Sequence, residues 1–227
     1  MTTPDAAPIS VMIADDQELV RYGLRLVLES ESDIRVVGEA ADGVEAVDGA
    51  LRWTPDVILM DVRMPGMDGI DATRVLARRL PDARVLVLTT YDLDESAFGA
   101  LRAGAAGFLL KNTPPAELVA AVRRIASGDA VISPRLTAKL IEVALPHLAG
   151  EDRRASDEAL AVLTEREREV FLQVARGLTN AEIAATLHLS ESTVKAHFGR
   201  ILVKLDLPHR VQAVILAYEL GVVRAAE

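Results

Sequence analysis

Short apolar runs alternate with amphipathic segments over residues 9–128. Continuous apolar runs are typical of strands buried on both faces, and apolar positions three or four residues apart are typical of helices. The alternation therefore predicts five strand–helix pairs in a parallel sheet with right-handed crossovers. The predicted strands are Ser10–Ala14, Ile34–Glu39, Asp56–Met60, Arg84–Thr89 and Gly107–Leu110, and the predicted helices lie near 17–30, 43–53, 68–80, 94–103 and 114–127.

The strand–helix alternation ends after Gly128. One short helix is expected at roughly 134–145, and residues 146–157 are polar, charged and without periodicity, as flexible linkers are. An all-helical unit follows, in which Thr164 and Thr179 each precede a glutamate by three residues, the spacing of a capping box. The expected organisation is a doubly wound α/β domain over 1–128, a linker with one short helix over 129–160, and a four-helix domain over 161–227.

Asp61 occupies a special place in the first domain. It follows the apolar run Val57–Met60 directly and precedes Pro65 and Gly66, which stop a strand and open a loop. The functional crevice of an open parallel sheet lies beyond the carboxyl ends of its strands. We therefore expect Asp61 to lie where ligands bind, the alternative being that it only caps the next helix.

Three other predicted strands end in polar residues at the same edge. These residues are Asp15, Asp16, Thr89 and Lys111. Converging carboxylates repel one another unless a divalent cation or a shared proton offsets their charge, and carboxylate oxygens suit Mg²⁺. A lysine and a hydroxyl group suit a phosphoryl oxyanion. The cluster favours metal-assisted transfer of a phosphoryl group to Asp61 over a structural Lys–Asp ion pair beside a solvated acidic patch.

These residues carry a family resemblance. Asp15-Asp16, the stretch from Met60 to Gly69, Thr89 and Lys111 resemble the motif set of bacterial response-regulator receiver domains, which have a flavodoxin-like fold. The resemblance implies that Asp61 accepts a phosphoryl group from a sensor histidine kinase. It also implies that Asp16 and Asp61, with the backbone carbonyl of Arg63 and assisted by Asp15, hold Mg²⁺.

The same resemblance implies a switch. Thr89 would hydrogen-bond the phosphoryl group with Phe108 as the coupled aromatic residue, and Lys111 would pair with the same group. The sequence departs from the family at two places: Asn112 follows the lysine where a proline is common, and Phe108 replaces the tyrosine of some members.

Residues 191–205 form an amphipathic helix with a basic face, and Ser190 is its expected cap. Its apolar stripe consists of Val194, Phe198, Ile201 and Leu205. The opposite face and one flank carry Ser192, Thr193, Lys195, Ala196, His197, Gly199, Arg200 and Lys204. Gly199 costs about 1 kcal/mol relative to Ala in a helix interior, which close approach to DNA or a helix crossing would explain. A recognition helix in the major groove fits this pattern, and a solvated helix face is the alternative.

The second domain also resembles a known family. The stretches 163–170, 177–184 and 189–197 resemble the LuxR-type helix-turn-helix of NarL/FixJ response regulators, over residues 161–222. The resemblance implies that Lys195, Ala196 and His197 lie in the DNA groove. It places the hydroxyl groups of Thr179, Ser192 and Thr193, together with Lys204, nearer the phosphates, while Gly199 departs from members with a polar or basic residue there.

The last predicted helix has two apolar stripes. One contains Val211, Val214, Ile215 and Tyr218, and the other, centred roughly 160° away, contains Ala213, Leu216, Ala217 and Leu220. Because a domain of this size offers one core, the second stripe predicts a partner. The simplest partner is the same helix of a second copy, and a homodimer suits two DNA half-sites.

Composition limits the classes of protein to consider. The chain has no cysteine, which excludes disulfides and thiolate metal sites. No apolar run approaches the roughly 20 residues that span a bilayer, and Met1–Pro8 lacks the features of a signal peptide, so a cytoplasmic protein without a membrane partner is expected. The net charge of −9 divides unevenly: residues 1–128 carry −7, whereas residues 162–227 are neutral.

The expected function is phosphorylation-controlled transcription regulation, in which phosphorylation of Asp61 promotes dimerisation and promoter binding. The receiver surface that pairs is expected at the helices near 94–103 and 114–127, or at those near 17–30 and 114–127. Two alternatives are a carboxylate-nucleophile phosphatase and a receiver controlled by ligand or partner binding. The first is disfavoured because Arg63 stands where such phosphatases have a second aspartate, and the second because the acid cluster is intact.

Overall fold

The computed structural model describes residues 7–89, 95–128 and 159–223. The chain divides into two compact units, residues 1–131 and 132–227, and each is described by itself. The helix expected near 134–145 and the expected linker segment 146–157 lie outside the described residues. In the described part of the chain, no helix is long and apolar enough to cross a membrane.

The first unit is a five-stranded parallel sheet with the order β2-β1-β3-β4-β5. Its strands are β1 (Ile9–Ala14), β2 (Ile34–Ala40), β3 (Val57–Asp61), β4 (Arg84–Thr89) and β5 (Gly107–Leu110). Its helices are α1 (Glu18–Glu29), α2 (Gly43–Trp53), α3 (Gly69–Arg79), α4 (Glu95–Ala103) and α5 (Pro115–Ala126). The predicted α/β fold is confirmed, and each predicted strand and helix lies within one residue of the observed bounds.

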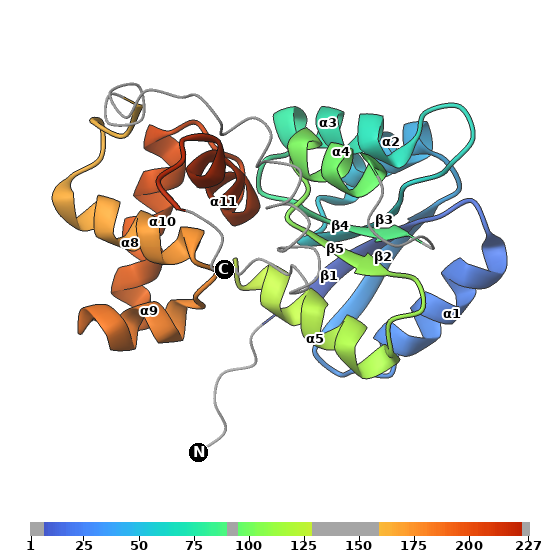
Figure 1. Cartoon of the computed structure of the whole chain (residues 1–227). Coiled ribbons are helices and arrows are strands. Elements are labelled where there is room, and N and C mark those ends of the chain that lie inside the picture. The colour runs from blue at the N-terminus through green and yellow to red at the C-terminus, as the bar shows by residue number, and fades with distance from the viewer. Residues whose placement is uncertain (1–6, 90–94, 129–158, 224–227) are drawn as a thin grey trace, which may run out of the picture. The chain divides into compact units, whose positions relative to one another are not determined.

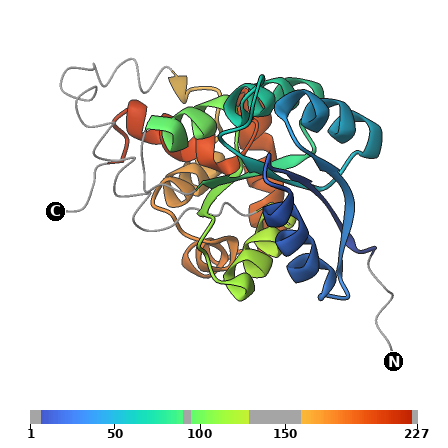
Figure 2. The same ribbon diagram turned by 90° about the vertical axis from the view of Figure 1, so that its right-hand side faces the viewer.

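Helices cover both faces of this sheet. Helices α1 and α5 lie on one face, and α2, α3 and α4 lie on the other (Figures 1 and 2). The central strand β3 is buried at all five positions, which explains why its sequence is apolar without alternation. The strand order changes direction between β1 and β3, and this switch point is where open α/β sheets form their ligand crevice.

The described part of the second unit, residues 159–223, is a bundle of four short helices. They are α8 (Glu165–Ala175), α9 (Asn180–Leu187), α10 (Glu191–Lys204) and α11 (Arg210–Glu219). Thr164 and Thr179 form complete capping boxes with Glu167 and Glu182, and the Ser190 hydroxyl accepts a hydrogen bond from the Thr193 amide. The three predicted helix starts are therefore confirmed. Phe171 and residues from all four helices form one buried core.

Thr54 gives a first prediction. This residue ends α2 in the left-handed conformation, with φ 45° and ψ 57°, where a β-branched side chain is unfavourable. We expect Thr54→Gly to stabilise the first unit by about 1 kcal/mol. Urea unfolding monitored by the fluorescence of Trp53, the one tryptophan of the chain, measures this unit selectively. Ser32→Gly, in an exposed turn without positive φ, is the control and should not stabilise.

Candidate functional site

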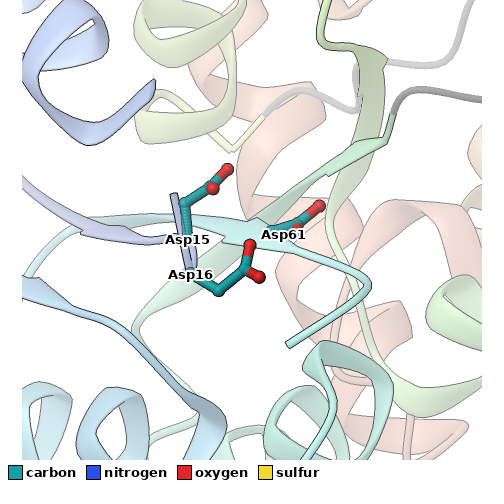
Figure 3. A group of neighbouring side chains, drawn as sticks. All are labelled: Asp15, Asp16 and Asp61. Atoms are coloured by element: carbon teal, nitrogen blue, oxygen red, sulfur yellow. The ribbon is translucent and has the colours of Figure 1, made fainter. Parts of the chain in front are cut away.

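Three carboxylates meet at the carboxyl edge of the sheet. Asp15 and Asp16 follow β1, and Asp61 is the last residue of β3. Because β1 pairs directly with β3, with Ala14 opposite Met60, the three side chains converge (Figure 3). One oxygen of each lies within 4.8 Å of the others. The side chains of Asp15 and Asp61 are buried, whereas Asp16 is exposed.

Lys111 supplies the opposing charge. Its Nζ atom lies 2.6 Å from Oδ2 of Asp15 and 3.1 Å from Oδ1 of Asp61. Lys111 follows β5, and its backbone amide donates a hydrogen bond of 2.7 Å to the carbonyl of Thr89. Strands β1, β3, β4 and β5 therefore all contribute to the network, as the sequence predicts.

Burial controls the protonation of this network. Burial raises the pKa of Asp61 above its ordinary value of 3.8, and the charge of Asp15 adds to the effect, although Lys111 acts in the opposite direction. Burial alone would lower the pKa of Lys111, but hydrogen bonding and charge from Asp15 and Asp61 raise it. Lys111 thus stays protonated, and its positive charge compensates only part of the cost of burying a charged Asp61.

The donor set fits a hard divalent cation. Three carboxylates lie together, and the ammonium group of Lys111 is close to two of them, Asp15 and Asp61. The Oδ1 atom of Asp15 accepts a hydrogen bond of 3.0 Å from the Gln17 amide. A cation would complete the coordination of the oxygens that face the cluster.

The loop after β3 is shaped by Gly69. Its amide donates a hydrogen bond of 3.0 Å to the carbonyl of Val62, which folds the loop containing Arg63 back on itself. A Cβ atom on Gly69 would lie 1.9 Å from the carbonyl oxygen of Asp61, so only glycine fits. The Asp68 side chain then caps α3 by accepting from the Asp71 amide.

The two predicted switch residues lie on one face of the sheet. Thr89 and Phe108 are both buried. Phe108 pairs with Val87, and Thr89 pairs with Leu110, so side-chain alternation puts Thr89 and Phe108 on the same side. No cis peptide bond occurs in the described ranges, which include Asn112.

Helix α10 presents the predicted basic face to solvent. Val194, Phe198 and Ile201 are buried, which confirms the apolar stripe. Ser192, Lys195, Ala196, Gly199 and Arg200 are exposed. A Cβ atom added to Gly199 would meet no neighbouring atom within 4 Å, so no described helix of this chain crosses at this glycine.

Several polar side chains of α10, and Thr179 at the start of α9, have partners within the domain. The hydroxyl groups of Ser192 and Thr193 each lie 2.8 Å from that of Ser190. The Thr179 hydroxyl donates to Glu182, and Arg200 Nη2 lies 3.0 Å from Nδ1 of the half-buried His197. All of these groups remain at the surface.

Lys204 differs from the other predicted DNA contacts. Its Nζ atom lies 2.6 Å from Oε2 of the buried residue Glu167, on α8. Its predicted position beside phosphates stays a prediction, and in the described structure its ammonium group is paired with a carboxylate of the same domain.

Arg210 is a structural residue that the sequence pattern did not reveal. It is buried, donates a hydrogen bond of 2.8 Å to Oδ1 of Asn180, and also donates to the carbonyl of Leu178. Its guanidinium lies 5.1 Å from the centroid of the Phe198 ring. Arg210 thus ties the start of α9 to the core side of α10, and no periodicity signals such a role.

Comparison with known proteins matches both units. Residues 11–123 match the response regulator receiver domain family, and residues 161–217 match the luxR family of bacterial regulatory proteins. The transcriptional regulatory protein YxjL of Bacillus subtilis is 43% identical over 95% of this chain and 98% of its own length. LiaR of the same species is 42% identical over 92% and 97%. The chain belongs to the LuxR-type response regulators.

A solved structure supports the same assignment. The crystal structure of ChrA, a response regulator of a heme-sensing two-component system, is 35% identical, with a TM-score of 0.51 and coverage of 96% of this chain and 100% of that one. This response regulator thus combines a receiver domain with a LuxR-type DNA-binding domain, and its relatives are two-component regulators of transcription.

The second apolar stripe of α11, which the sequence predicts to be a dimer face, is largely covered in the structure. Ala213 and Ala217 are fully buried and belong to the core of the DNA-binding domain, and Leu220 packs against that core. The interpretation of the second stripe of α11 as a free dimer face is therefore wrong for Ala213 and Ala217. Other residues of the DNA-binding domain pack around Ala213 and Ala217, whereas Leu216 and Leu220 stay half-buried.

The raised pKa of Asp61 yields a prediction about stability. An acid whose pKa is raised by folding stabilises the folded state below its unfolded pKa and loses that contribution as pH rises through the folded pKa. Asp61→Asn should therefore be more stable than the wild type at neutral pH without Mg²⁺, and the difference should shrink toward pH 4.

Thermal unfolding followed by Trp53 fluorescence, in EDTA at several pH values, measures the difference. Asp48→Asn, which changes an exposed carboxylate of α2, should stay within about 0.5 kcal/mol of the wild type. Equal stability of Asp61→Asn and the wild type at every pH would contradict the argument.

Proposed function

We propose that Asp61 is the phosphoryl acceptor of this response regulator. A carboxylate oxygen of Asp61 attacks the phosphorus of a phosphohistidine on a sensor kinase. The P–N bond breaks, its electron pair returns to the imidazole, and an acyl phosphate forms on Asp61. The observation that carries the proposal is the position of Asp61, at the buried edge between two aspartates and the ammonium of Lys111. Arg63 offers no second carboxylate for turnover, so Asp61 acts as an acceptor and the protein as a regulator.

Mg²⁺ is the proposed cofactor. Asp15, Asp16 and Asp61, with the backbone carbonyl of Arg63, would hold it, and it would supply positive charge that neutralises the phosphoryl oxygens. Lys111 lies close enough to Asp61 to pair with a phosphoryl group attached there.

The proposed response is a shift between two conformations of the receiver. Thr89 would hydrogen-bond the phosphoryl group, and Phe108, buried on the same face of the sheet, would move with it. The shift would favour a homodimer through α4 and α5 or through α1 and α5. Two DNA-binding domains would then bind two half-sites of a promoter in the cytoplasm.

Helix α10 is the proposed recognition helix. Lys195, Ala196 and His197 lie in the N-terminal half of α10, the part of a recognition helix that contacts bases. Lys195 and Ala196 are exposed, and His197 is half-buried. Arg200 and the hydroxyl groups of Thr179, Ser192 and Thr193 would contact phosphates. Lys204 is left out of this set because Glu167 holds it.

Phosphorylation provides the direct test. Incubation of the full chain with acetyl phosphate and Mg²⁺ should add the mass of one phosphoryl group and shift the protein toward a dimer. Intact mass spectrometry and size-exclusion chromatography measure the two effects. Asp61→Asn and EDTA-treated wild type should show neither.

Each outcome has a defined meaning. An adduct that persists in Asp61→Asn would place the acceptor elsewhere, and the absence of any adduct in the wild type would favour a receiver controlled by ligand or partner binding. An adduct without dimer would overturn the proposed assembly while leaving the acceptor in place.

Gly199 provides a test of the DNA interface. Gly199→Ala should stabilise α10 by up to about 1 kcal/mol, because its surroundings are open and alanine favours the helix. The same methyl group should weaken DNA binding, since it occupies the closest approach of the backbone to the groove. Circular dichroism and fluorescence anisotropy, with a duplex selected by the protein from a random library, measure both.

Gly23→Ala is the matched control for this test. Gly23 lies within α1 and also has no atom within 4 Å of an added Cβ, but it belongs to the receiver. It should stabilise its own helix by a similar amount and leave the DNA affinity of the unphosphorylated protein unchanged. Unchanged affinity of Gly199→Ala would show that DNA does not approach the helix at this position.

A further inference from the structure

A buried carboxylate lies behind the basic flank of the recognition helix. Glu167 is the third residue of α8, and its side chain is 4% exposed. It accepts a hydrogen bond of 2.9 Å from the Thr164 amide, which completes the capping box. The same carboxylate contacts two basic residues of α10: its Oε2 atom lies 2.6 Å from Nζ of Lys204, and its Oε1 atom lies 3.6 Å from Nε of Arg200.

The two basic residues are held to different degrees. Lys204 makes the short contact and keeps 35% of its side chain exposed, whereas Arg200 makes the long one and keeps 58% exposed. They lie one helical turn apart, on the flank that continues the proposed DNA face toward the C-terminus of α10. Hydrogen bonds from Lys204 and the Thr164 amide also lower the pKa of Glu167 to about 2, so the carboxylate stays charged at physiological pH.

We propose that Glu167 is a positioning residue that withholds Lys204 from DNA phosphates and thereby limits binding to DNA of unrelated sequence. The proposal rests on the proposed role of α10 as the recognition helix. It assigns to this carboxylate a second role beyond capping α8.

The physical argument is a competition between two anions for one ammonium group. A phosphate that captured Lys204 would leave the buried carboxylate of Glu167 without its cation, and an uncompensated buried charge is strongly unfavourable. Contacts to phosphates supply most of the affinity for non-specific DNA, through counterion release. The ion pair with Glu167 neutralises Lys204 within the domain and so removes one phosphate contact. Residues near Lys195 and Ala196, which can reach bases, then determine a larger share of the affinity.

Salt-dependent binding of the full chain tests the proposal. The probe is a fluorescent 30-bp duplex of random sequence, and the quantity is the slope of log Kobs against log [NaCl]. Glu167→Gln keeps an oxygen for the Thr164 amide but removes the charge that holds Lys204. We expect tighter binding and a slope steeper by about 0.9, which corresponds to one additional phosphate contact.

A double-mutant cycle separates this role from a structural one. Lys204→Gln in the wild-type background should leave the slope unchanged, whereas Lys204→Gln added to Glu167→Gln should remove the additional 0.9. Loss of the cap alone would lower the melting temperature and the affinity without a steeper slope. Glu169→Gln removes one charge from the exposed surface of the same helix and controls for net charge; its slope should equal that of the wild type.

The outcomes distinguish this proposal from the proposed DNA interface. A slope for Glu167→Gln equal to that of the wild type would overturn the role of Glu167. A slope reduced by Lys204→Gln alone would overturn it as well. This second result can be measured even if Glu167→Gln does not fold. Lys195→Ala tests the interface separately: because Lys195 is proposed to contact bases, the change should reduce the preference for a duplex selected by the protein over the duplex of random sequence. If Lys195→Ala has no effect, the assignment of α10 as the recognition helix fails first.

Discussion

One ammonium group between two buried carboxylates is the constraint on which the receiver edge depends. Asp15 follows β1 and Asp61 ends the adjacent strand β3, and their buried carboxylates would repel each other without Lys111. The lysine reaches them from β5, across β4, so its position depends on the register of the whole sheet. A reaction that changes the charge on Asp61 therefore changes the electrostatic interactions among residues at the ends of four strands.

The DNA-binding domain also contains polar side chains that connect different secondary-structure elements. Its core is apolar, but the relative positions of its helices are fixed by polar anchors that cross between them. Glu167 joins α8 to α10, and Arg210 joins α11 to the start of α9. Arg166 adds a hydrogen bond of 2.7 Å from α8 to the carbonyl of Leu187, at the end of α9. Such directional contacts set helix orientation, which an apolar core of mostly aliphatic side chains specifies less strictly.

The sequence predicted local features well and long-range ones unevenly. Strands such as β3 were predictable because a strand that is buried on both faces has a continuous apolar run. The Thr164 and Thr179 caps were predictable because all residues of a capping box lie within four positions of the sequence. The convergence of Asp15, Asp61 and Lys111 was predictable because parallel strands end at one edge. The contact of Lys204 was not, since its partner lies 37 residues away on another helix. Periodicity also showed that α11 is apolar on two sides, but not that its own domain covers Ala213 and Ala217.

The open surface around Gly199 has a consequence for the history of such regulators. No described atom lies within 4 Å of the place where a side chain would begin, so larger residues can be introduced there without repacking the core. On the proposed role of α10, one codon at this position could, after a gene duplication, change which promoters the daughter protein prefers while both copies keep folding. The fold separates the part of the helix that evolution must preserve from the part that it is free to vary.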